Sequence, residues 1–244
     1  MDELIVRDDG PVRVISINRP HKLNALSNGV AKGLEQAFKE FDASPQKAAV
    51  LAAEGRSFTA GADINDLPEF WRCVPTVGIT TDKPVIAAVQ GWCVGGGVVM
   101  AAMADLCVAA DDTTFWYPEA TLGLTGGMIC ALAGRIPHKA AMEVMYLARK
   151  TSAQRAYEMG LVNQVVLAGQ QQEAAIAMAH ELCRLAPLVL RSIKRIVNNH
   201  VLPKGPAEIA AAMTRDNLVI TSSQDFQEGR AAFREKRTPQ FTGT

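Results

Sequence analysis

Apolar residues in the first half of the chain follow the patterns of β-strands. Residues 12–17 alternate between apolar and polar side chains. Together with Leu4-Ile5-Val6 and a turn at Asp8-Asp9-Gly10, they predict a β-hairpin. A short strand is also predicted from Thr114 to Tyr117. Unbroken apolar runs are typical of strands buried on both faces, and they occur at residues 48–53, 85–89 and 106–110.

Helical patterns appear once among these strands and dominate the second half. Between Ser27 and Phe41, apolar residues recur every three or four positions, which predicts a helix with Ser27 as its N-cap. After Pro137 the predicted helices cover residues 140–147, 152–159, 171–185, 187–198 and 207–233, the last broken near 221–223. The order of elements predicts an α/β fold with a helical C-terminal region.

A run of three glycines follows the apolar strand at residues 85–89. After Gly91 the chain passes through Gly95-Gly96-Gly97 into a predicted helix at residues 98–104. Adjacent glycines let a ligand approach the backbone closely, and the first N–H groups of the helix point outward with the positive end of its dipole behind them. This turn is suited to an anion or to a developing oxyanion.

A second loop of small residues follows the strand at residues 48–53, and it contains Ala60-Gly61-Ala62. If the two strands are neighbours in one sheet, the N–H groups of Ala62 and Gly96 converge on one carbonyl oxygen.

Glu119 stands just after Pro118, between the predicted strand and a glycine-containing loop. A carboxyl group that faces an apolar pocket has a raised pKa, which suits it to proton transfer near neutral pH. The alternative is a solvated loop glutamate.

Composition narrows the class of protein. The chain has 244 residues, of which 48% are hydrophobic, and equal numbers of acidic and basic side chains. This is enough for one sizeable domain, with or without an appendage, and nothing indicates a nucleic-acid partner or an anionic membrane surface. Residues 84–104 are uncharged, but four glycines and Gln90 favour a buried strand, turn and helix over a membrane span.

Five cysteines without CxxC spacing indicate neither a zinc site nor a disulfide framework, so we expect no metal and a reduced, cytoplasmic protein. The first ten residues are acidic and lack the apolar core of a secretory signal, so we expect the mature chain to start there. The glycine turn does not match G-x-G-x-x-G, which disfavours a dinucleotide-binding enzyme, and neither a P-loop nor a G-x-S-x-G elbow occurs.

Several phrases resemble the crotonase, or enoyl-CoA hydratase/isomerase, superfamily. They are FTAGADI (58–64), KPVIAAVQGWCVGGG (83–97) and FWYPEATLGLTGG (115–127), with weaker matches at 18–26, 152–162 and 228–237 in the same order. The resemblance covers nearly the whole chain. It implies a spiral of ββα repeats in residues 1–185, which hold an acyl-CoA site, and a helical trimerisation region in residues 186–244. The expected assembly is a homotrimer or a dimer of trimers.

The resemblance also implies a reaction. Hydratases of this superfamily carry two glutamates, whereas here Val99 stands in place of one and Glu119 matches the other. We therefore expect an enoyl-CoA isomerase, in which Ala62 and Gly96 hold the thioester oxygen while Glu119 moves a proton from C2 to C4 of a 3-enoyl-CoA. A hydratase using Glu119, a thioester hydrolase, a decarboxylase and a non-catalytic acyl-CoA-binding subunit are the alternatives.

Coenzyme A is expected only as part of the substrate, with no other cofactor. The resemblance implies that His21 and Lys22 lie near coenzyme A and the Ala60 backbone near its adenine. It also implies that Lys236 lies near the phosphates, donated across a subunit boundary. For the basic residues the alternative is a solvated side chain.

The segment at residues 65–81 is shorter than in most relatives, in which it helps to form the acyl pocket. We expect Trp71, Val99 and Trp116 to line this pocket. The alternative for Trp71 is simple packing.

Overall fold

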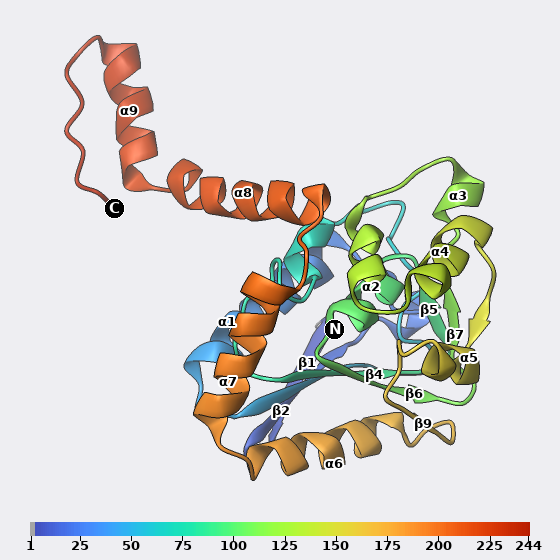
Figure 1. Ribbon diagram of the computed structural model, residues 1–244. Coiled ribbons are helices and arrows are strands. Elements are labelled where there is room, and N and C mark those ends of the chain that lie inside the picture. Colours follow the sequence, from blue (N-terminus) through green and yellow to red (C-terminus); the bar gives the residue numbers. More distant parts are fainter. Residues whose placement is uncertain (1–2) are drawn as a thin grey trace.

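A computed structural model describes residues 3–244, and its centre is a mostly parallel β-sheet (Figure 1). The strand order is β1-β2-β3-β4-β6-β9. Only the β1–β2 hairpin is antiparallel, and the other neighbours run parallel. The strands are β1 Leu4–Asp9, β2 Val12–Ile17, β3 Ala48–Ala53, β4 Val85–Val89, β6 Leu106–Ala110 and β9 Gln164–Val166.

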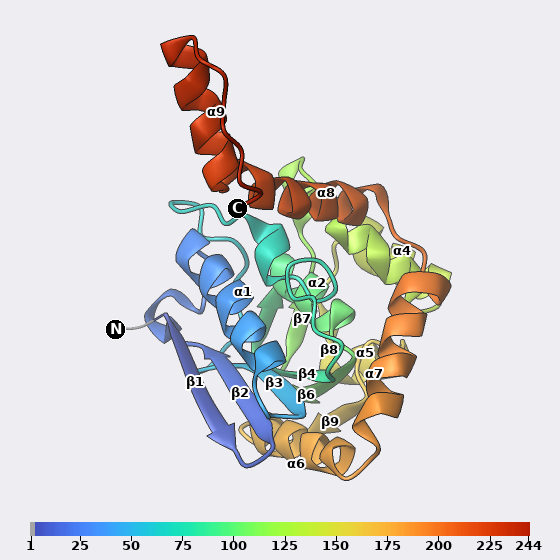
Figure 2. The ribbon, with the colours of Figure 1, turned by 90° about the vertical axis from the view of Figure 1, so that its left-hand side faces the viewer.

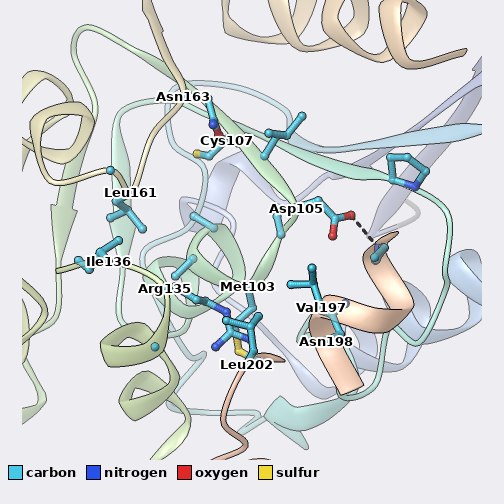
Figure 3. A pocket seen from close by; sticks show the side chains of 18 of the residues that line it. Met103, Asp105, Cys107, Arg135, Ile136, Leu161, Asn163, Val197, Asn198 and Leu202 are labelled. Carbon is cyan, nitrogen blue, oxygen red and sulfur yellow. Dashed lines mark hydrogen bonds and ion pairs between the residues drawn. The ribbon is translucent and has the colours of Figure 1, made fainter. Parts of the chain in front are cut away.

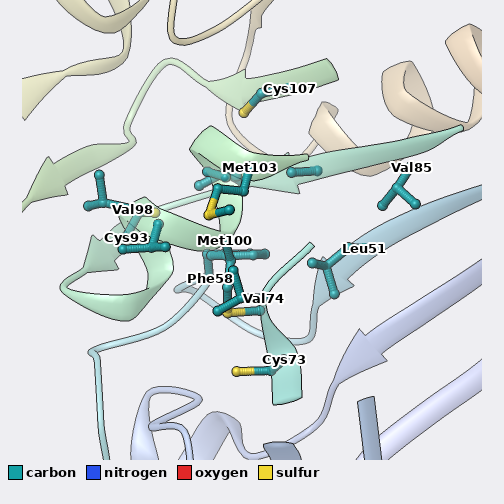
Figure 4. Packing of buried hydrophobic residues seen from close by; sticks show 14 of the residues in the cluster. Leu51, Phe58, Cys73, Val74, Val85, Cys93, Val98, Met100, Met103 and Cys107 are labelled. Carbon is teal, nitrogen blue, oxygen red and sulfur yellow. The ribbon is translucent and has the colours of Figure 1, made fainter. Parts of the chain in front are cut away.

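Strands β3, β4 and β6 are buried on both faces, which explains their unbroken apolar runs, whereas the edge strand β1 is mostly exposed. Along β4, Val85, Ala87 and Val89 join one hydrophobic cluster, whereas Ile86 and Ala88 join another on the opposite face. The larger cluster includes residues of helix α2, which Figure 4 shows packed near Phe58 and Leu51. Alternate residues of each strand therefore serve two separate cores.

A smaller sheet extends from the carboxyl ends of these strands. It contains β5 Trp92–Val94, β7 Thr114–Trp116 and β8 Thr151–Ser152, in that order. An isolated bridge pairs Thr59 with Cys93, so the loop after β3 joins the edge of this sheet. The two loops of small residues are thereby fixed side by side.

Helices cover both faces of the main sheet. Ser27 caps α1, because its Oγ accepts a hydrogen bond of 3.0 Å from the Val30 N–H. The helix α6 packs on the opposite face (Figure 1). The α-helices of this part are α1 Asn28–Ala43, α2 Gly96–Met103, α3 Glu119–Leu122, α4 His138–Leu147, α5 Ala153–Glu158 and α6 Gln171–Cys183. Short 3₁₀ helices are η1 Pro20–Lys22, η2 Phe70–Cys73 and η3 Met128–Gly134.

The C-terminal helices leave the body of the molecule. They are α7 Pro187–Ile196, continued by the π-helical turn η4 Val197–Val201, then α8 Pro206–Thr221 and α9 Gln224–Glu235. Both ribbon views show α9 projecting away from the sheets (Figure 2). The expected boundary at residue 185 falls between α6 and α7, and the division into two domains stays a prediction. Among residues 3–244, none of the helices has the length and apolar character that a bilayer span requires.

The α/β prediction is confirmed, with local corrections. Strand β1 continues through Asp9, so Asp8 and Asp9 are not turn residues. Asp8 instead pairs across the hairpin with Arg13, whose Nε lies 2.8 Å from its Oδ1. Helix α2 begins at Gly96, two residues earlier than the apolar pattern indicated. The strands β5, β8 and β9 were not predicted, because segments of two or three residues rarely show a period, and of these short strands only β7 was predicted.

Candidate functional site

The glycine turn carries unpaired backbone donors at the start of α2. Gly95 has φ of 54° and ψ of −112°, a backbone conformation that residues other than glycine rarely adopt. Its own N–H donates to the Trp116 carbonyl at 2.9 Å, which ties the turn to β7. Within residues 3–244, the Gly96 N–H donates to no other group. This N–H is therefore available to a ligand at the positive end of the helix dipole.

A second available donor comes from Ala62. The Leu26 N–H donates to the Gly61 carbonyl and the Asp63 N–H donates to the Leu26 carbonyl, both at 2.8 Å. Gly61 and Asp63, on either side of Ala62, thus bond to Leu26, and the Ala62 N–H points away from Leu26. No acceptor for that N–H occurs in the described part of the chain. The two donors predicted from the sequence are thus both free, in loops that the Thr59–Cys93 bridge holds together.

Glu119 lies directly beside the glycine turn. A Cβ atom built on Gly95 would be only 2.8 Å from Glu119 Oε1, so the carboxyl group rests against the Gly95 backbone. Its Oε2 atom is buried and has no hydrogen-bond partner among residues 3–244. Burial raises the pKa of Glu119 to about 7, and a backbone hydrogen bond opposes this only in part. The carboxyl group therefore exchanges a proton readily near neutral pH.

Apolar side chains lie at the start of α2, beside the glycine turn. Val99, one helical turn after Gly96, is 3% exposed. The ring of Phe70, in η2, covers Gly96 so closely that a Cβ atom there would overlap it. Glycine at position 96 is thus required for the ring to lie there.

Residues expected near coenzyme A lie beside the Ala62 loop. His21 and Lys22 are exposed in η1, and Lys22 Nζ is 3.4 Å from Asp63 Oδ2. The Ala60 N–H donates to the Leu23 carbonyl at 2.9 Å, which joins the two segments. Hydrogen bonds, first of all from Arg19, hold the pKa of Asp63 below its ordinary value. The carboxylate anchors the basic segment next to the Ala62 loop.

Three other predicted residues lie farther from the turn or face elsewhere. Lys236 is exposed at the end of α9, which both ribbon views place away from the sheets (Figures 1 and 2). Trp71 is half-buried, and the Arg72 guanidinium lies 4.5 Å from its ring centre. The Trp116 indole donates to the Ala148 carbonyl at 2.9 Å. The roles of these residues toward a substrate stay predictions.

Two residues at the site escaped sequence reasoning. Phe70 carries no pattern of its own, and its neighbour Trp71 drew attention through its size. Asn24 is fully buried, and its side-chain amide donates at 2.7 Å to the carbonyls of Glu54 and Ser57. It thereby fastens the basic segment to the loop after β3. The Asn24 backbone is left-handed, with φ of 55°, a conformation that asparagine adopts more readily than most residues. An asparagine in a predicted turn is the sequence signal that could have marked this position.

Other features do not contribute to this site. Burial raises the pKa of Cys93 well above its ordinary value, so its thiol is an inert part of the core. A cavity of about 450 Å³ lies between the C-terminal end of α2 and α7 (Figure 3). Met103, Arg135 and Leu202 line it, together with the Asp105–Lys194 ion pair, but neither Glu119 nor the two free donors do.

Known proteins resemble this chain over its whole length. The family model described as enoyl-CoA hydratase/isomerase matches residues 7–244. A carnitinyl-CoA dehydratase of Salmonella typhi is 30% identical, covering 99% of each chain. A 2,3-dehydroadipyl-CoA hydratase of Escherichia coli is 30% identical over 100% of both chains. The crystal structure of an enoyl-CoA hydratase from Mycobacterium tuberculosis superposes with a TM-score of 0.76, at 33% identity and full coverage of both chains.

These matches confirm the crotonase-type fold that the sequence phrases predicted, including the helical C-terminal region. They also correct the emphasis of the sequence interpretation, because the relatives' names describe hydratases and dehydratases and give no specific support to an isomerase. The chain is an enzyme of the enoyl-CoA hydratase/isomerase family.

Proposed function

We propose that the protein catalyses the reversible addition of water to the C2=C3 double bond of a 2-enoyl-CoA thioester, with Glu119 as the single acid and base. The observation that carries this proposal is the Glu119 carboxyl group. It is partly buried, has a pKa raised to about 7 and lies against the same turn as the free Gly96 N–H. No cofactor is proposed, and coenzyme A enters as part of the substrate.

In the dehydration direction, the thioester oxygen of a 3-hydroxyacyl-CoA accepts hydrogen bonds from the N–H groups of Ala62 and Gly96. The Glu119 carboxylate removes the proton from C2, and the bonding electrons form an enolate that these donors stabilise. The enolate electrons then form the C2=C3 bond and the thioester carbonyl is restored, while the C3–O bond breaks and its electron pair leaves on oxygen. Glu119 gives its proton to this departing hydroxide, and water is released. Hydration follows the same steps in reverse.

One carboxyl group is sufficient for this cycle, because the proton taken from C2 is the proton given to the leaving hydroxide. A pKa near 7 balances the two tasks, since the carboxylate must accept the proton and the acid must release it. The unpaired, buried Glu119 Oε2 supports the proposal, because a carboxyl group without donors is poorly solvated. The names of the relatives support water chemistry over other reactions of an enolate.

An isomerase that converts 3-enoyl-CoA to 2-enoyl-CoA is the second candidate, and Val99 favours it. This apolar side chain is 3% exposed. By the family resemblance of the sequence, it stands where hydratases carry a second glutamate that shares the attacking water. With Glu119 alone, transfer of a proton between C2 and C4 needs no water at all.

Mass spectrometry in heavy water separates the two candidates. The purified protein is incubated with 2-butenoyl-CoA and, separately, with 3-butenoyl-CoA, and the products are compared with those of the Glu119→Gln variant. We expect 2-butenoyl-CoA to gain the elements of deuterium oxide, with deuterium at C2. A shifted double bond in 3-butenoyl-CoA, with no water gained by either substrate, would overturn the proposal in favour of the isomerase. Release of free coenzyme A or of carbon dioxide would overturn both.

We also propose a homotrimer, or a dimer of trimers, in the cytoplasm. Support for an oligomer comes from the projecting C-terminal helices, which leave large apolar side chains exposed, among them Val219, Ile220 and Phe233. Native mass spectrometry tests the subunit number, and a monomer at micromolar concentration would contradict this proposal.

A further inference from the structure

The segment between the Ala62 loop and β4 places an aromatic ring on the proposed oxyanion site. A Cβ atom on Gly96 would overlap Cε2, Cζ and Cδ2 of the Phe70 ring. The ring is thus in contact with the residue whose N–H is free to bind a thioester oxygen. A thioester that binds this N–H therefore comes close to the ring.

Phe70 is held firmly where it is. The Cys73 thiol donates to the Phe70 carbonyl, with 3.1 Å between sulfur and oxygen, and Cys73 and Val74 are fully buried in the main core (Figure 4). Arg72 forms an ion pair with Glu35 on α1, and its Nε donates to Glu69 Oε2 at 2.9 Å. Because η2 is fixed by both core packing and charge, the ring acts as a wall rather than as a movable lid.

We infer that Phe70 is a specificity-determining residue that limits the acyl group of the substrate to a short chain. This inference rests on the proposed function, since it takes the Gly96 N–H as the donor to the thioester. The ring fills the space beside Gly96, one helical turn before the buried Val99. A short acyl chain fits beside the ring, whereas a longer chain meets it.

Binding of saturated acyl-CoA thioesters tests the inference without any reaction. Isothermal calorimetry measures the Kd of butyryl-CoA and octanoyl-CoA for the wild type, Phe70→Ala and the milder Phe70→Leu. We expect the wild type to bind butyryl-CoA about tenfold more tightly than octanoyl-CoA. Phe70→Ala is expected to abolish or reverse this ratio, and Phe70→Leu to reduce it. Thermal melting checks that each variant is folded, and Tyr146→Ala, an exposed aromatic on α4, serves as the matched control.

The adjacent Trp71 provides the sharpest comparison, because it is equally bulky but contacts Arg72. A change of chain-length ratio in Trp71→Ala and not in Phe70→Ala would overturn the assignment. Equal affinity of the wild type for both thioesters would overturn it as well. Hydration is assayed separately. Thioester binding with the expected ratio but without water addition refutes the proposed reaction and supports the role of Phe70, whereas no binding of either thioester refutes both.

Discussion

Two buried or partly buried glutamates show how environment separates a structural carboxylate from a reactive one. Glu35 on α1 is 6% exposed, and its oxygens accept hydrogen bonds from Lys39 and Arg72. Burial alone would raise its pKa, but these two cations outweigh burial and hold the pKa below its ordinary value. Glu119 is also shielded from solvent, yet its Oε2 has no partner in the described chain, so burial prevails and raises its pKa to about 7.

The difference lies in what each carboxyl group is surrounded by, rather than in how deeply it is buried. The donors around Glu35 keep its carboxylate ionised, and its ion pair with Arg72 holds η2 against α1. Glu119 lies against the Gly95 backbone and its Oε2 has no donor in the described chain, so its charge is costly and its proton is exchangeable. The first group contributes to stability, and the second is available for chemistry.

The largest expected effect comes from Glu119→Gln, which keeps the shape of the side chain but removes its proton exchange. We expect the rate of water addition to fall by about a thousandfold or more, while the Kd of butyryl-CoA changes less than threefold. Steady-state kinetics and calorimetry measure the two quantities. Glu158→Gln, an exposed change on α5, is the matched control and should leave both unchanged. Activity of Glu119→Gln within tenfold of the wild type would contradict a single-base mechanism.

Removing the Glu35 carboxylate should lower the stability of the fold. Glu35→Ala leaves the mostly buried Arg72 guanidinium without its main partner, and we expect the free energy of unfolding to fall by about 2 kcal/mol. Urea denaturation measures the change. In the double variant Glu35→Leu with Arg72→Met, apolar side chains replace both charges, so most of the stability should return. A double variant less stable than Glu35→Ala would show that the pair itself, and not the unpaired charge, accounts for the loss.

The sequence predicted these two glutamates unequally, for a physical reason. Glu119 stood out because it follows Pro118 at the end of a strand and matches a family phrase, and the glycine turn is equally visible. Glu35 lies in a regular helical pattern, and its partner Arg72 is 37 residues away. Long strands were predictable because burial on two faces leaves unbroken apolar runs. Contacts between distant residues, such as Phe70 on Gly96, leave no local pattern.

The pH dependence of the activity should report the raised pKa of Glu119. Because the carboxylate form of Glu119 starts the cycle in both directions, kcat/KM should fall about tenfold per pH unit below a pKa of about 7. Measuring kcat/KM for 2-butenoyl-CoA over a series of pH values tests this decrease. A midpoint near 4.5 would contradict the raised pKa of Glu119.

The two glutamates should also make the stability of the fold depend on pH, each in its own pH range. The pKa of Glu119 is higher in the folded state than its ordinary 4.5, so the folded state binds more protons between about 4.5 and 7, and this group lowers stability as pH rises through that window. The pKa of Glu35 is lowered by folding, so its contribution is present above its ordinary pKa of 4.5 and is lost on further acidification. Urea unfolding of wild type and Glu119→Gln across pH 4.5 to 8 isolates the first effect.

The smallest effect should come from the outer partner of Glu35. Lys39 lies one helical turn away, and its side chain is 61% exposed, so water and salt screen its attraction to the carboxylate. We expect Lys39→Ala to lower the free energy of unfolding by about 0.4 kcal/mol, and 1 M salt to remove most of that difference. Urea denaturation at two salt concentrations measures both, with Lys32→Ala on the same helix as control. A loss as large as that of Glu35→Ala would mean that Lys39, and not Arg72, keeps this carboxylate charged.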